Sequence, residues 1–235
     1  MFDFIFLDLD NTLLDFAACE AEALRASLEH FGVTMTPQML ARYSAINDEK
    51  WRLLELGEID RRTLQLSRFS DFFVEFQLPL SPTAFNRCYL ETLGRQGICL
   101  PGARELLQEL YPQAKLYLVS NGVDAVQNSR LESSGLAPFF TAVFNSERIG
   151  VQKPDPAFFE ACFRGIEGFE PARAVLVGDS LRSDILGANR VGIASCWYNP
   201  AGAPVEGEAV PDCQVQRLED IPGALTVLEF QRQFD

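Results

Sequence analysis

The sequence has no closely spaced pair of cysteines, no stretch rich in lysine and arginine, and no long apolar run. Its scattered cysteines form no C-x-x-C pair, a pattern that fits neither a zinc site nor a small disulfide scaffold. They are Cys19, Cys88, Cys99, Cys162, Cys196 and Cys213. Reduced thiols are therefore expected, as is usual in a cytoplasm.

The formal net charge of −13 comes without any block of basic residues, which argues against nucleic acid and anionic membrane surfaces as partners. Asp3, Asp8 and Asp10 occupy positions where a signal peptide would have basic residues and then an unbroken apolar stretch. No run approaches the roughly 18 apolar residues of a membrane span. The sequence predicts a soluble, cytoplasmic monomer or homodimer, and its single histidine, His30, receives no role.

An apolar run at residues 2–7 leads directly into Asp8 and Asp10. Short apolar runs bounded by turn residues suit strands that are covered on both faces, as in a parallel sheet. Ligands bind beyond the carboxyl ends of such strands, which is where Asp8 would lie. Residues 10–12 could instead form a turn that caps the following helix, and this segment taken alone does not decide between the two.

Residues 15–97 contain no candidate for a buried strand and have apolar residues at helical spacing almost throughout. Thr36-Pro37 and Ser81-Pro82 each combine an N-cap residue with a first-turn proline, which is typical of a helix start. We expect a bundle of roughly four helices. Its core is expected to include Phe69, Phe72, Phe73 and Phe76.

From Pro101 onward, predicted helices and strands alternate, which indicates a doubly wound sheet. The predicted strands are residues 115–119, 141–145, 174–177 and 193–198. Residues 200–211 are rich in glycine and proline and are predicted to be loop. The fold class is therefore α/β, with a doubly wound parallel sheet built from residues 1–14 and 98–235 and a helical bundle inserted at 15–97.

Polar side chains follow the predicted strands in a fixed order. They are Asp8 and Asp10, then Ser120, then Lys153, then Asp179 with Asp184. If the ends of these strands are neighbours, the acids come together with the lysine and with a hydroxyl beside an Asn-Gly turn. Such a site is suited to a phosphate and a divalent cation. Mg²⁺ takes oxygen ligands and usually one or two protein carboxylates, a need that Asp8 and Asp179 fit.

Four segments carry a resemblance to a known family. They are Asp8-Leu9-Asp10-Asn11-Thr12, Ser120-Asn121-Gly122, Lys153-Pro154 and Gly178-Asp179-Ser180 through Asp184. In this order they resemble the four motifs of the haloacid dehalogenase-like (HAD) hydrolase superfamily. The bundle inserted after the first motif resembles the helical C1 cap of that superfamily, so a Rossmann-like core is expected around it. Asn11 departs from the commoner glycine, although asparagine also adopts turn conformations.

The resemblance implies a phosphoryl-transfer site. Asp8 would be the nucleophile that forms an aspartyl-phosphate, and Asp10 would act as general acid and then as general base. Lys153 would neutralise both the phosphate and Asp8. The phosphate would be bound by Lys153, by Ser120 and by the amides of Asn121 and Gly122.

The family pattern also implies a Mg²⁺ site. Asp8, the carbonyl of Asp10 and Asp179 would bind the ion, and Asp184 would orient a metal-bound water. Asp184 could instead be a first-turn acid favoured by the helix dipole, and Ser180 could be a helix cap rather than a phosphate contact.

In a dehalogenase of this superfamily the intermediate is an ester on carbon, and no alkoxide leaves that would need a proton. The second acid, Asp10, therefore favours a phosphatase over a dehalogenase. Residues 56–69 and 195–199 resemble bacterial pyrimidine 5′-nucleotidases of the YjjG type, which implies nucleoside 5′-monophosphates such as dUMP, UMP and dTMP as substrates. Candidate contacts for the base are Phe16, Tyr43, Trp51 and Arg68.

Two other functions are considered. One is a phosphatase for another small monoester, such as phosphoglycolate or a sugar phosphate. The other is a catalytically silent binding module, which would be expected to have lost Asp8, Asp10 or Asp179, and all three are present.

Overall fold

The structure, a computed structural model, describes residues 2–232, and this part of the chain divides into two compact units. One unit is Ala17–Gln96, and the segments on either side of it form the other. No helix within the described residues is both long enough and apolar enough to cross a membrane.

The larger unit is built on a parallel sheet, which has six strands among residues 2–232. They are β1 (Phe4–Leu7), β2 (Lys115–Ser120), β3 (Ala142–Asn145), β4 (Ala174–Gly178), β5 (Ala194–Tyr198) and β6 (Cys213–Val215). Their order is β3-β2-β1-β4-β5-β6, and every neighbouring pair is parallel. The predicted α/β fold with a doubly wound parallel sheet is confirmed, and β1 lies between β2 and β4.

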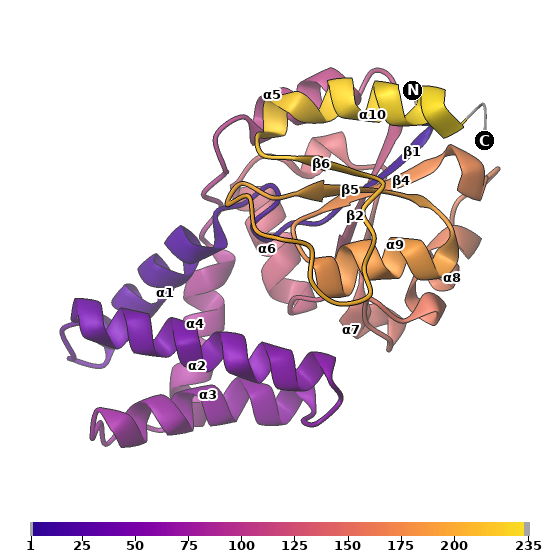
Figure 1. Cartoon of the computed structure of the whole chain (residues 1–235). Helices are drawn as coiled ribbons and strands as arrows, with labels where there is room; N and C mark the ends of the chain where they lie inside the picture. The colour runs from indigo at the N-terminus through magenta and orange to yellow at the C-terminus, as the bar shows by residue number, and fades with distance from the viewer. Residues whose placement is uncertain (1, 233–235) are drawn as a thin grey trace. The chain divides into compact units, whose positions relative to one another are not determined.

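Helices cover both faces of the sheet (Figure 1). On one face lie α5 (Ala103–Leu110) and α10 (Ile221–Arg232), and on the other lie α8 (Pro156–Arg164) and α9 (Leu186–Val191). The remaining helical segments of this unit are α6 (Asp124–Ser133), α7 (Ser146–Ile149), a π-helical turn (Leu181–Ile185) and the 3-10 turns Ala137–Phe139, Pro171–Arg173 and Leu218–Asp220.

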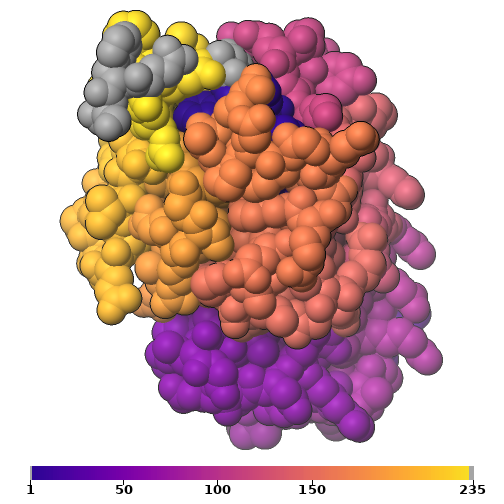
Figure 2. All heavy atoms as spheres, turned by 90° about the vertical axis from the view of Figure 1, so that its right-hand side faces the viewer, coloured from indigo at the N-terminus to yellow at the C-terminus, as the bar shows by residue number. Residues whose placement is uncertain are grey.

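Successive side chains of β1 point to opposite faces of the sheet. Ile5 and Leu7 pack with α5 and α10, whereas Phe4 and Phe6 pack with α8. The whole strand is buried, and Figure 2 shows only a small indigo patch of the N-terminal segment between the yellow and orange segments. This burial on both faces explains why β1 is a continuous apolar run in the sequence.

The four interior strands β1, β2, β4 and β5 begin and end within a residue or two of their predicted bounds, because each is an apolar run closed by a turn. The edge strand β6 was not predicted. It has three residues and follows the loop rich in glycine and proline, so it carries too little pattern to indicate a strand.

The smaller unit contains α1 (Phe16–His30), α2 (Pro37–Glu55), α3 (Arg61–Glu75) and α4 (Pro82–Gly94). Phe16, the first residue of α1, belongs to the larger unit. The predicted caps are confirmed. The Thr36 side chain accepts a hydrogen bond from the Met39 amide at 3.2 Å, and the Ser81 side chain accepts one from the Ala84 amide at 3.4 Å. Each cap satisfies an amide that the first turn of a helix leaves without a backbone partner.

Aromatic rings fill the core of the helical unit. Phe69 lies at the centre, with its ring centroid 4.9 Å from that of Phe85, 5.2 Å from that of Tyr89 and 5.3 Å from that of Tyr43. Phe69, Phe72 and Phe73 are buried, which confirms the core role predicted for them, whereas Phe76 is half-buried. Tyr43 was a candidate contact for a nucleotide base, but its fully buried ring is part of this core.

A chain of buried polar groups crosses the same unit. Ser44 Oγ donates to one oxygen of Glu20 at 2.5 Å, and Asn47 Nδ2 donates to the other at 2.9 Å. Arg68 donates to Asn47 Oδ1 at 2.9 Å and to Asn86 Oδ1 at 3.1 Å, so this second candidate base contact is also engaged inside the bundle. Burial raises the pKa of Glu20 to about 7, against the hydrogen bond from Ser44, which lowers it.

This raised pKa makes the stability of the protein depend on pH. The folded protein binds the Glu20 proton more tightly than the unfolded chain does, so stability falls as pH rises from about 4.5 through about 7. We predict that Glu20→Gln, which is neutral at every pH, exceeds the wild type in stability by up to about 3 kcal/mol at pH 8. Urea denaturation of both proteins between pH 5 and pH 8 measures the difference.

Glu22→Gln on the same helix is the matched control. Glu22 is exposed and paired with Arg25, which lowers its pKa, so its pH effect has the opposite sign. If the difference between Glu20→Gln and the wild type did not grow with pH, Glu20 would not carry the titration assigned to it.

Candidate active site

The strand order brings three chain segments together at one edge of the sheet. Leu7 at the end of β1 pairs in register with Leu118 of β2 and with Val177 of β4. Asp8 follows β1 and Asp179 follows β4, and the Asp8 amide donates to the carbonyl of Val177 at 3.0 Å. Because the strands are parallel, these residues lie at the same edge, where α/β proteins bind their ligands.

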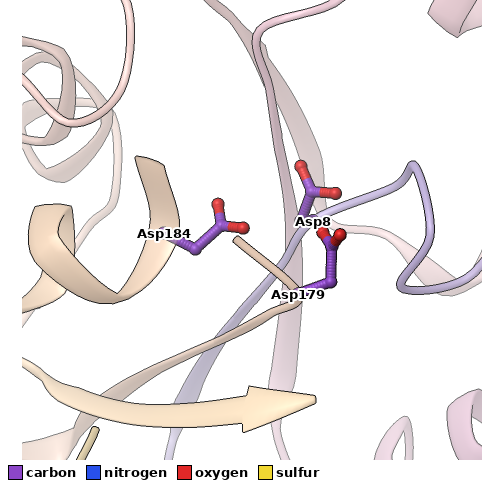
Figure 3. A group of neighbouring side chains, drawn as sticks. All are labelled: Asp8, Asp179 and Asp184. Carbon is purple, nitrogen blue, oxygen red and sulfur yellow. The ribbon is translucent and has the colours of Figure 1, made fainter. Parts of the chain in front are cut away.

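Asp8, Asp179 and Asp184 form a compact group of acids (Figure 3). Each offers a carboxylate oxygen within 4.8 Å of the oxygens of the other two. Two neighbours hold Asp179: Thr12 Oγ1 donates to its Oδ1 at 3.5 Å, and Trp197 Nε1 donates to its backbone carbonyl at 2.8 Å. The arrangement supplies the oxygen ligands that a hard divalent cation prefers.

The π-helical turn aims Asp184 at this group. Its Oδ2 accepts a hydrogen bond from the Ser180 amide at 3.1 Å, and Ser180 Oγ caps the turn by accepting from the Ser183 amide at 3.2 Å. A Cβ atom at Gly178 would lie 2.7 Å from the Cβ of Asp184, so only glycine leaves the space for this approach. The alternative role of Ser180 as a helix cap is confirmed. Asp184 does more than interact favourably with a helix dipole, because its side chain is aimed at the other acids.

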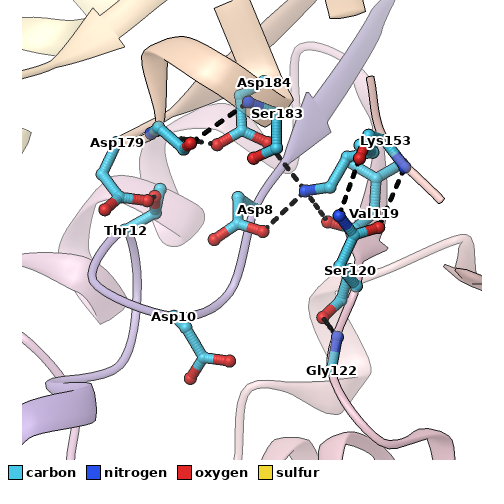
Figure 4. Close-up of polar contacts among 12 residues, drawn as sticks. Asp8, Asp10, Thr12, Val119, Ser120, Gly122, Lys153, Asp179, Ser183 and Asp184 are labelled. Atoms are coloured by element: carbon cyan, nitrogen blue, oxygen red, sulfur yellow. Dashed lines mark hydrogen bonds and ion pairs between the residues drawn. The ribbon is translucent and has the colours of Figure 1, made fainter. Parts of the chain in front are cut away.

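Lys153 joins the acids to the neighbouring strand (Figure 4). Its Nζ donates to Asp8 Oδ1 at 2.8 Å, to Asp184 Oδ1 at 2.7 Å and to the carbonyl of Val119 at 2.8 Å. A lysine ammonium has three hydrogens, and these contacts use all of them. The side chain is 1% exposed, so its charge acts where water screens it little.

The charges of this group shift one another's pKa values. Burial acts to lower the pKa of Lys153, but Asp184 and Asp8 outweigh it, so the pKa is raised and the ammonium stays charged. Burial, followed by the neighbouring carboxylates of Asp8 and Asp184, raises the pKa of Asp179. The negative charge of these neighbouring acids therefore exceeds what the single positive charge of Lys153 can offset. This excess favours the binding of a further cation.

The segment after β2 positions both the lysine and a hydroxyl group. The Asn121 side chain accepts from the backbone amide of Lys153 and donates to its carbonyl, each at 3.0 Å. Ser120 Oγ accepts from the Gly122 amide at 3.1 Å and from Gln127 Nε2 at 2.8 Å. Both oxygen lone pairs of Ser120 are thus used, so its hydroxyl hydrogen is what it offers an anion.

Asp10 has partners that sequence reasoning missed. Its carboxylate accepts hydrogen bonds from Gln127 Nε2, at 2.7 Å, and from Arg130 Nη1. In Figure 4, Asp10 lies on the loop after Asp8, apart from the group around Lys153. Gln127 and Arg130 are three residues apart, on one side of the helix that follows Ser120. This spacing is the sequence signal that could have indicated that they act together.

Removing the charge of Lys153 tests whether it holds the acids together. We predict that Lys153→Met lowers the free energy of unfolding at pH 7 by about 3–5 kcal/mol, because it leaves Asp8 and Asp184 buried without their cation. The loss should be smaller at pH 5, because burial raises the pKa of Asp8 to about 7 and this carboxyl group is then protonated. Urea denaturation in the presence of a chelator measures both values.

The double variant Lys153→Met/Asp184→Asn is the control for specificity. It should be more stable than Lys153→Met alone, because it removes one of the two stranded charges. A single variant as stable as the wild type would show that the ion pairs contribute nothing to the fold.

The chain resembles proteins of known family. Residues 2–192 match the haloacid dehalogenase-like hydrolases. The pyrimidine 5′-nucleotidase PynA of Streptococcus pneumoniae is 38% identical over 94% of this chain and 93% of its own. The pyrimidine 5′-nucleotidase YjjG of Escherichia coli is 32% identical over 84% of this chain and 86% of its own.

A solved structure gives the same result. The HAD-hydrolase YfnB of Bacillus subtilis, in a crystal form bound to magnesium, is 35% identical and superposes with a TM-score of 0.91, over 95% of this chain and 98% of its own. The match to the family over most of the sequence, together with the lysine and acids at the end of a parallel sheet, shows that this chain belongs to the haloacid dehalogenase-like hydrolase family.

Proposed function

We propose that this protein is a Mg²⁺-dependent phosphomonoesterase that works through an aspartyl-phosphate on Asp8 and acts on pyrimidine nucleoside 5′-monophosphates. The observation that carries the reaction is the buried contact between Lys153 and Asp8, with the second acid, Asp10, two residues away. The similarity to PynA and YjjG supports the substrate class.

The placement of these groups supports the following reaction. Asp8 attacks phosphorus, the bond from phosphorus to the ester oxygen breaks, and Asp10 gives its proton to that oxygen so that an alcohol leaves. In the second step Asp10 takes a proton from water, the water oxygen attacks phosphorus, and the bond to Asp8 breaks. Lys153 reduces the repulsion between the Asp8 carboxylate and the anionic substrate.

The phosphate group would bind between the ends of β1 and β2. The Ser120 hydroxyl donates to a phosphate oxygen, and the backbone amide of Asn121 lies beside it, just before α6, whereas the Gly122 amide donates to Ser120 Oγ in this structure. Lys153 acts on the same oxygens chiefly through its charge, because Asp8, Asp184 and the Val119 carbonyl occupy its hydrogens in this structure. Such positioning and charge compensation supply most of the catalysis in phosphoryl transfer.

The donor set fits Mg²⁺. Carboxylates that each offer an oxygen within 4.8 Å of the others are the hard ligands this ion prefers, and it commonly binds through one or two of them. Asp8, Asp179 and the Asp10 carbonyl would hold it, and Asp184 would orient a bound water. When bound, the ion would offset negative charge on the phosphate as the ester bond breaks.

The two compact units are proposed to divide the work. Residues 1–14 and 98–235 would form the catalytic core, and residues 15–97 would act as a C1 cap that chooses the leaving group. Trp51 and Phe16 remain candidate contacts for the base, whereas Tyr43 and Arg68 are committed to the interior of the bundle.

Phosphate release from a panel of monoesters, with and without Mg²⁺, tests the function. We predict that UMP, dUMP and dTMP are consumed much faster than phosphoglycolate or sugar phosphates, and only with the metal. Asp8→Asn should lose at least about 10³-fold in kcat while its circular dichroism is unchanged, because only the nucleophile is removed. A preference for another monoester would overturn the substrate class alone, and a metal-independent rate unaffected by Asp8→Asn would overturn the mechanism.

Metal binding can be measured without turnover. Because a ligand that binds only the folded state stabilises it, millimolar Mg²⁺ should raise the Tm of the wild type. We predict that Asp179→Asn abolishes most of this increase, and that Asp124→Asn, at a half-buried carboxylate paired with Arg148, leaves it intact. An increase of equal size in Asp179→Asn would remove Asp179 from the site.

A further inference from the structure

Two side chains of α6 engage both oxygens of the Asp10 carboxylate. Arg130 Nη1 donates to Oδ1, and Gln127 Nε2 donates to Oδ2 at 2.7 Å. The two donors are also joined to each other, because Gln127 Oε1 accepts from Arg130 Nη1 at 3.0 Å. The carboxylate is therefore fixed in rotation as well as in position.

Gln127 also connects Asp10 to the proposed phosphate site. The second hydrogen of its amide goes to Ser120 Oγ at 2.8 Å. A Cβ atom at Gly122 would lie 2.6 Å from Gln127 Cδ, so the glycine provides the space in which the amide lies. One side chain thus sets the distance between the hydroxyl that meets the phosphate and the acid that meets the leaving group.

The burial of Arg130 needs an explanation other than stability. The residue has no exposed surface, and its guanidinium carbon lies 5.6 Å from the centre of the Phe16 ring. Removing a guanidinium from water is unfavourable, and an apolar side chain of similar volume often serves a protein interior as well or better. An apolar side chain in place of Arg130 could not form the ion pair with Asp10.

Asp10 stays reachable while it is held. Its side chain is 29% exposed, whereas that of Arg130 is 1% exposed. A carboxylate has about four lone-pair directions, and the two donors occupy one on each oxygen. The remaining directions can exchange a proton with an ester oxygen or with water.

We propose that Gln127 and Arg130 are positioning residues that hold the Asp10 carboxyl group in the orientation in which it transfers protons. This rests on the phosphomonoesterase activity proposed above and assigns roles to two residues outside the four family motifs. Loss of either residue lets the acid rotate, and catalysis is sensitive to errors of this kind because reacting groups must be aligned.

Three esters of similar size separate proton transfer from general damage to the site. p-Nitrophenyl phosphate releases a stable phenolate that needs no proton, phenyl phosphate is intermediate, and benzyl phosphate releases an alkoxide that needs one. The constant kcat/KM reports the steps through formation of the aspartyl-phosphate, in which Asp10 acts as the acid.

We expect Arg130→Met to lower kcat/KM for benzyl phosphate by about 10²-fold or more, and for p-nitrophenyl phosphate by less than about tenfold. Gln127→Met should have a smaller effect in the same direction, since it leaves the ion pair in place. It also strands no buried charge, so it tests the proposal if Arg130→Met does not fold.

Two controls define the effect. Arg148→Met removes an exposed arginine of α7 whose Nε lies 2.8 Å from Oδ1 of Asp124, on α6, and it should change none of the three rates. Asp10→Ala/Arg130→Met should lose no more activity than Asp10→Ala alone, because Arg130 acts through Asp10.

Each other outcome overturns the inference. Equal losses for all three esters would show a structural role only, unchanged rates would show no role, and additive losses in the double variant would show that Arg130 acts independently of Asp10. A wild type that hydrolyses neither UMP nor any of these esters would overturn the proposed function and this inference with it, whereas the outcomes above, seen with an active wild type, overturn this inference alone.

Discussion

The site depends on the interactions of the Lys153 ammonium group. It is buried, and it contacts the carboxylates of Asp8 and Asp184 and the carbonyl of Val119. Without it, two acids would face each other where water cannot screen them, at a cost that few folds tolerate. Because these acceptors come from the ends of β1 and β2 and from the turn after β4, one side chain ties together three segments distant in sequence.

The backbone keeps that lysine in place. The Asn121 side chain donates to the Lys153 carbonyl and accepts from the Lys153 amide, so the loop after β2 determines where the ammonium lies. Gly178 leaves the space through which Asp184 reaches Nζ. The parallel order β2-β1-β4 does the rest, since it places the ends of three neighbouring strands at one edge.

Features carried by local signals could be predicted from the sequence. The helices of the smaller unit begin where an N-cap residue precedes proline, as at Thr36 and Ser81, because capping involves only neighbouring residues. The interior strands were predicted because burial on both faces requires unbroken apolar runs. The acids, hydroxyl and lysine of the site were predicted by their order along the chain.

Features that depend on contacts between distant residues could not be predicted in this way. Gln127 and Arg130 are ordinary helix residues by propensity, and only the fold brings them to Asp10, more than a hundred positions earlier. Arg68 appeared as a candidate ligand contact because a nucleotide base needs hydrogen-bond donors. The bundle instead buries it, and its Nη1 and Nη2 donate to Asn47 and Asn86.

The balance of charge links the proposed metal to the proposed substrate. The acids Asp8, Asp10, Asp179 and Asp184 outnumber the cations Lys153 and Arg130, so with all groups ionised the site is negative. A phosphate monoester also carries close to two negative charges at neutral pH, as its second pKa is about 6. The lysine alone cannot offset both, because its ammonium is shared between two carboxylates. A divalent cation among the acids would offset the two excess negative charges, so the phosphate would no longer meet a negative site, and by reciprocity the phosphate would strengthen binding of the cation. The excess of acids that makes the metal-free site repel anions is therefore the same feature that would make metal and substrate bind together.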